Sequence, residues 1–75
     1  MPLTKYDLKN AEERVAEVLK HVDRQRTALA SLDPGSPDAR WVGQVLAAME
    51  RTLKAFEEHR SRIAEELRNK ASDQK

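Results

Sequence analysis

The sequence predicts an all-α fold, an antiparallel two-helix hairpin of coiled-coil type that dimerises into a four-helix bundle. Three observations predict this fold. Apolar residues recur every three or four positions in two stretches, and a Pro-Gly turn separates the stretches. With three aromatic residues and two glycines in 75 residues, the composition does not suit a β-sandwich or barrel. We expect a single helical-hairpin domain over residues 1–75.

The first helix is expected over residues 4–32. Thr4 suits the N-cap, and Asp7 takes the acidic position of a capping box, where its carboxylate accepts a hydrogen bond from an unpaired N–H. The helix is expected to stop before Pro34, because proline lacks an N–H and disfavours helical backbone in the residue before it. Its apolar seam comprises Leu8, Ala11, Val15, Val18, Val22, Leu29 and Leu32, with Gln25 as its one polar step.

A turn is expected over residues 33–36 and a second helix over 37–69. The run Ser36-Pro37-Asp38 is a start signal, with serine at the N-cap, proline at the first helical position and an acid in the first turn. Beyond this helix the apolar pattern ends, so residues 70–75 are expected to fray. The helix carries two apolar tracks: Val42, Val45, Met49, Thr52, Phe56, His59 and Ile63, and beside them Leu46, Leu53, Arg60 and Leu67.

The short connection leaves the helices side by side and antiparallel, so facing residues have numbers that add up to about 70. Leu29 is then expected near Trp41, and Val18 near Leu53. The apolar face of the second helix is broader than a two-helix seam needs, and a chain without cysteine has no disulfide to stabilise so small a core.

Self-association is therefore expected, most simply as a homodimer with two-fold symmetry, and a different protein partner is the alternative. The expected contact surface consists of Trp41, Val42, Val45, Leu46, Met49, Leu53, Phe56 and Ile63.

The chain offers little for catalysis or metal binding. His21 and His59 are the only histidines, and the expected register separates them by about 15 Å along the rod. Neither histidine has a glutamate three residues before it, as a di-iron bundle requires. The polar residues near the seam, Gln25, Thr52 and Arg60, are expected to set the register of the helices. We expect no enzyme activity, no catalytic residues, no cofactor and no metal.

Charge and hydropathy exclude other classes. Fourteen basic and thirteen acidic residues leave a net charge of +1, and acids are interspersed among the arginines, so no nucleic-acid surface is expected. No stretch approaches the roughly 20 apolar residues of a membrane-spanning helix. Residues 1–30 carry scattered acids and no long apolar core, unlike a secretory signal or transit peptide. A cytoplasmic protein with no membrane partner is expected.

Two resemblances remain. Trp41-Val42-Gly43 spells the Trp-x-Gly of small hairpins secreted by type VII systems, but there the motif lies in the turn, which Pro34-Gly35 makes here. The second resemblance covers Glu13 to Leu67. It rests on Arg24-Gln25, Leu29, Gly35, Asp38-Ala39, Leu46 and above all on Met49-Glu50-x-Thr52-Leu53 followed by His59-Arg60-x-x-Ile63.

In these residues the chain resembles a group of short uncharacterised helical-hairpin proteins of α-proteobacteria. It departs from the group at Pro34 and Pro37, which stiffen a turn that is usually centred on glycine. The resemblance implies a helical hairpin. It implies no activity and no site residues, since none is established for the group.

Overall fold

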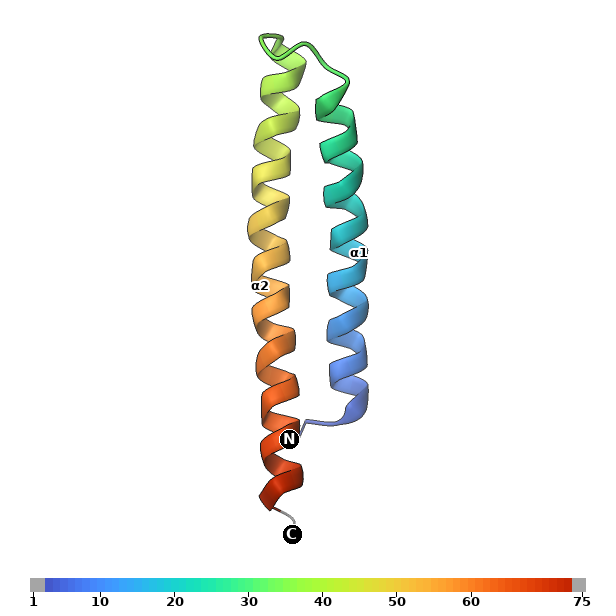
Figure 1. The fold of residues 1–75 in the computed structure, drawn as a ribbon, viewed down its shortest axis with the longest axis vertical. Helices are drawn as coiled ribbons and strands as arrows, with labels where there is room; N and C mark the ends of the chain where they lie inside the picture. The colour runs from blue at the N-terminus through green and yellow to red at the C-terminus, as the bar shows by residue number, and fades with distance from the viewer. Residues whose placement is uncertain (1–2, 74–75) are drawn as a thin grey trace.

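The computed structural model describes residues 3–73 as two antiparallel α-helices joined by a short turn (Figure 1). Helix α1 spans Lys5–Ala30 and helix α2 spans Pro37–Asp73. The two helices lie side by side along the whole of α1, and α2 continues beyond the start of α1 (Figure 1). The rod measures 59 × 17 × 14 Å. The expected all-α hairpin is confirmed.

The start of α1 is stabilised by a local hydrogen-bond pair. Thr4 is the N-cap and has extended backbone angles, φ −125° and ψ 171°. The Asp7 carboxylate accepts from the Thr4 backbone N–H at 2.7 Å and from the Thr4 hydroxyl at 3.2 Å. An N–H that the helix leaves unpaired is thereby satisfied, as the capping-box spacing predicts.

Helix α1 ends at Ala30, two residues before the expected end at residue 32. The prediction of residue 32 was wrong because Pro34 acts further back than on the residue before it. A proline ring clashes with the carbonyl four residues earlier, which here belongs to Ala30. Ser31 completes the end, since its hydroxyl donates to the Ala28 carbonyl at 2.8 Å and its N–H donates to the same carbonyl at 3.2 Å.

Ser36 connects the turn to α2. Its N–H and its hydroxyl both donate to the Asp33 carbonyl, at 3.0 and 2.8 Å. The same hydroxyl accepts from the Ala39 N–H at 3.1 Å, which is the N-cap bond expected from the sequence. One serine side chain therefore closes the turn and begins the next helix.

Helix α2 continues to Asp73, so the fraying expected over residues 70–75 is wrong for its first four residues, and residues 74–75 lie outside the described part. The loss of apolar periodicity does not stop a helix by itself. No glycine or proline follows Gly43 in the sequence, and Lys70 near the end complements the negative pole of the helix.

The core of the hairpin is a narrow seam. Among the described residues, every buried apolar side chain except Ala39 lies at a predicted seam position, and Val22 is the one with no exposed surface at all. Ala39 lies one heptad before Leu46, nearer the turn than the predicted tracks begin. The other large apolar seam residues are half-buried, because a single neighbouring helix covers only one side of each. The buried residues are Ala11, Val15 and Val22 of α1 and Ala39, Leu46 and Ile63 of α2.

The register agrees with the expected sum of about 70 to within a helical turn. Val18 shares a surface groove with Thr52, and Ala11 shares a hollow with His59.

Trp41 is the exception to the expected neighbours. The expected proximity of Trp41 to Leu29 is wrong, because Leu29 lies beside Ala39 and Gly43, and the Trp41 side chain is 66% exposed. Trp41 follows the buried Ala39 by two residues, about 200° around the helix, and so points away from α1.

We predict that Val22→Ala lowers the free energy of unfolding by about 2 kcal/mol, through lost apolar burial and an unfilled space in the seam. Val18→Ala is the matched control, because it removes the same atoms from a half-buried site one turn away and should cost clearly less. Urea unfolding followed by circular dichroism measures both, at one protein concentration low enough for the chain to be a single hairpin. Equal losses of unfolding free energy in the two variants would contradict the conclusion that Val22 contributes most to the core.

We predict that Gly43→Ala raises the free energy of unfolding by about 0.5–1 kcal/mol. Gly43 lies inside α2 in helical backbone, and a methyl group there would meet no atom within 4 Å. Ala47→Gly makes the reverse change one turn later and should lower the same free energy by a similar amount. A destabilising Gly43→Ala would show that something packs closely against this glycine.

Candidate interaction surface

Two long faces flank the seam, and they differ in chemistry. One carries an ion pair between the helices, with Arg26 Nη2 3.6 Å from Glu50 Oε2, and we call it the ion-pair face. The other holds an open groove of about 370 Å³ between the helices, and we call it the groove face. The groove is lined by Val18 and His21 of α1 and by Val45, Ala48, Met49 and Thr52 of α2.

The groove is lined mainly by apolar groups. Val45 and Met49 are half-buried at its sides, and Ala48 is exposed. The one hydroxyl of the lining, on Thr52, donates to the Ala48 carbonyl at 3.2 Å within its own helix. The Thr52 hydroxyl therefore needs no hydrogen bond from a partner, and an apolar side chain can cover the α2 side of the groove without leaving that hydroxyl unsatisfied. The other polar group of the lining is the exposed His21 imidazole on α1.

Trp41 extends the apolar surface toward the turn. It precedes Ala48 by two helical turns, so both residues lie on the same side of α2. Tyr6 and Leu19 are the other large apolar side chains found exposed in the described part. Leu19 lies one heptad before Arg26 and therefore belongs to the ion-pair face. Among these three residues, Trp41 alone adjoins the groove.

The expected contact residues separate into three sets. Leu46 and Ile63 are only 8% and 5% exposed, so α1 already covers them and they have little surface left for a partner. Trp41, Val45 and Met49 lie on the groove face and remain accessible. The other three, half-buried along the seam, are Val42, Leu53 and Phe56.

Some groove residues were missed by the sequence analysis. Ala48 and Thr52 follow Trp41 and Val45 by seven residues each, and a seven-residue repeat marks one side of a coiled-coil helix. That spacing was available in the sequence. Val18 and His21, by contrast, join the groove only through the register between the helices.

The two histidines lie apart on the groove face. His21 lines the groove, and His59 lines a hollow of about 180 Å³ further from the turn, beside Leu3 and Ile63. Both side chains are exposed. Among the side chains that the structure describes, residues 3–71, no three histidines, aspartates or glutamates gather closely enough to hold a metal ion.

The polar seam residues keep contact with solvent. Gln25 and Arg60 are half-buried and Thr52 is exposed. In the described part of the chain, no buried side-chain nitrogen or oxygen lacks a hydrogen-bond partner. A role for these residues in setting the register stays a prediction.

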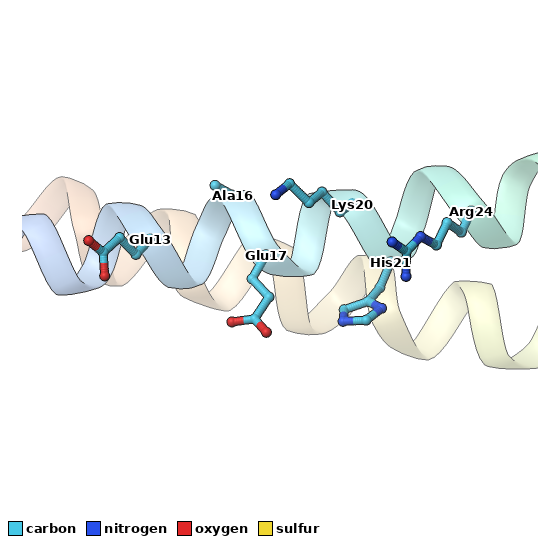
Figure 2. Close-up of a pocket in the computed structure, with 6 residues that line it drawn as sticks. All are labelled: Glu13, Ala16, Glu17, Lys20, His21 and Arg24. Carbon is cyan, nitrogen blue, oxygen red and sulfur yellow. The ribbon is translucent and has the colours of Figure 1, made fainter.

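The outer surface of α1 forms a shallow hollow of about 450 Å³ (Figure 2). Figure 2 shows Glu17 and His21 pointing to one side of α1, with Lys20 on the other side. All of its residues come from this single helix, with the acids Glu13 and Glu17 toward one end and the bases Lys20 and Arg24 toward the other. No second element of the described structure closes over them to make a binding site. The lining residues are Glu13, Ala16, Glu17, Lys20, His21 and Arg24.

Neither helix, over the residues described, has a segment both long and apolar enough to cross a membrane. No known family matches the chain, and neither a curated protein nor a solved structure matches it. The resemblance to the α-proteobacterial hairpins therefore stays a prediction, and the chemistry of the groove face is the basis for a functional proposal.

Proposed function

We propose that the chain is a non-enzymatic, cytoplasmic protein–protein interaction module that forms a homodimer through apolar helix faces, as a four-helix bundle. The observation that carries this proposal is the groove with the exposed Trp41 beside it. An apolar surface that runs along two helices and ends at an accessible tryptophan is typical of a contact surface.

The small core supports the same proposal. Two of the six buried residues are alanines, Ala11 and Ala39, which contribute little apolar area. A large apolar side chain stabilises a fold by about 1.5–3 kcal/mol only when it is fully buried. Val45 and Met49 reach that state only when a second chain covers the groove. Dimerisation would thus supply burial that one hairpin lacks.

The size of the rod fits a stable contact. Its long sides measure 59 Å by 14 to 17 Å, about 800–1,000 Å² in projection, and a standard interface buries about 800 Å² on each partner. Coverage of one long face by a second hairpin therefore reaches the area of a specific interface.

A small regulator or adaptor that packs against a larger protein is the alternative. The position of Trp41 favours it, because an exposed tryptophan near one end of a groove can anchor a foreign helix. The two functions differ in what the isolated chain does. A self-associating module is a dimer alone, and an adaptor is a monomer until its partner is present.

We predict a mass of twice 8.6 kDa in sedimentation equilibrium over about 1–100 μM protein, falling at the lowest concentrations. Ala48→Glu should weaken the dimer at least about 100-fold, because it buries a charge in the contact. Ala48 is exposed in the hairpin, so the single chain should still fold, as circular dichroism checks.

Leu19→Glu is the matched control. It places the same charge at a partly exposed apolar site, 42% accessible, on the ion-pair face, and should leave the dimer intact. A mass of 8.6 kDa at every concentration would overturn self-association. Dissociation by Leu19→Glu with an intact Ala48→Glu dimer would place the contact on the other face.

A further inference from the structure

We propose that the second copy covers the groove face in antiparallel fashion, with each helix over its own counterpart and the two-fold axis crossing the rod near His21 and Met49. This inference rests on the proposed homodimer and specifies its geometry. The proposal rests on three contacts that one two-fold axis produces together. Two of them pair opposite charges, and the third pairs apolar surfaces.

The groove face has a charged half and an apolar half. Glu17 and Arg24 lie two turns apart along one edge of α1, where the groove face meets the outer surface, and both also line the hollow on that surface. Asn10 lies two turns before Glu17 on the same edge and lines the hollow that holds His59. On α2 the strip from Trp41 to Ala55 carries no charge. The members of that strip at successive turns are Trp41, Val45, Ala48, Thr52 and Ala55.

In the antiparallel arrangement α1 faces the partner's α1, and facing residues there have numbers that add up to about 41. Glu17 then lies opposite the partner's Arg24, and Arg24 lies opposite the partner's Glu17. Both side chains are exposed in the single hairpin, so they are available to pair. The two-fold symmetry makes this contact twice.

The same axis pairs α2 with the partner's α2, where facing numbers add up to about 100, because His21 and Met49 share one level of the rod. Asp38 then lies opposite the partner's Arg62, a second pair of opposite charges. Trp41 meets the partner's His59, which is exposed. Across the middle, the uncharged strips of the two α2 helices cover each other.

The parallel arrangement of two-fold symmetry lacks this match. It places α1 over the partner's α2 at equal height, where facing numbers add up to about 70. Arg24 would then lie on the partner's Val45, and Glu17 on the partner's Thr52. The uncharged strip would then displace water from both charged groups and offer neither of them an opposite charge, which disfavours that arrangement.

Charge reversal tests the α1 contact. Glu17→Arg and Arg24→Glu should each raise the dimer dissociation constant about tenfold, because each turns two attractions into two repulsions. The double variant Glu17→Arg/Arg24→Glu should return it to within about twofold of the original value. Lys20→Glu is the control, because it changes the net charge as Arg24→Glu does but points to the side of α1 opposite to Glu17 and His21 (Figure 2).

A distance between turns tests the orientation. The chain has no cysteine, and a side chain at Gly35 would meet no atom within 4 Å, so Gly35→Cys accepts a spin label in the turn. Gly35 lies about 15 residues from the axis, so the antiparallel dimer should give about 45 Å between labels at 1.5 Å per residue. A parallel dimer brings both turns to one end, with labels less than about 25 Å apart, since the helices of a bundle pack about 10 Å from each other.

The outcomes separate the two proposals. A chain that stays monomeric at every concentration overturns the homodimer itself. A dimer with the short label distance, or one in which the double charge reversal fails to restore binding, overturns the antiparallel arrangement and leaves the homodimer standing. A dimer with the long distance and with restored binding supports both.

Discussion

A hairpin of two helices can bury only one stripe of each helix, and this geometric limit governs the rest of the structure. The seam satisfies it with small and medium side chains, of which Val22 alone is fully enclosed. Everything apolar outside the stripe stays accessible, whatever the sequence contains. The second helix contains more apolar surface than its stripe holds, and the groove face is the result.

The two faces that flank the seam differ in their chemistry. On the ion-pair face, Arg26 and Glu50 bridge the helices, and such a contact tolerates water on its outer side. On the groove face, α2 offers Val45 and Met49 with no side chain above them. The charged residues of that face lie mainly on α1. A partner that covers this face therefore has to satisfy charges along one helix and exclude water along the other.

Much of the fold could be predicted from the sequence, because its signals are local. Thr4, Ser36 and Pro34 act within four residues of themselves, so the starts of both helices and the place of the turn follow from a few atoms. The ends of the helices were predicted less well. Pro34 shortened α1 through a carbonyl four residues back, and α2 outlasted its apolar pattern because nothing in its last residues breaks a helix.

The interaction surface was less predictable than the fold. Whether a residue belongs to this surface depends on where the residues of the other helix lie. Leu46 and Val45 are adjacent and both apolar, yet α1 covers the first and leaves the second at the edge of the groove. His21 joins Val45 only through the register. Composition and periodicity identify apolar positions, but the rotation of each helix about its axis decides which of them remain accessible.

The two hydrogen bonds of the Ser36 hydroxyl have a consequence for the order of folding. Its contacts with Asp33 and Ala39 span only three residues each, so they form with little loss of chain entropy. Pairs near the turn, such as Leu32 with Ala39, close a loop of a few residues, whereas Ala11 and Ile63 must close one of about fifty. The two helices should therefore pair first next to the turn and then progressively away from it. The end of the hairpin furthest from the turn should be the last part to pair and the first to separate.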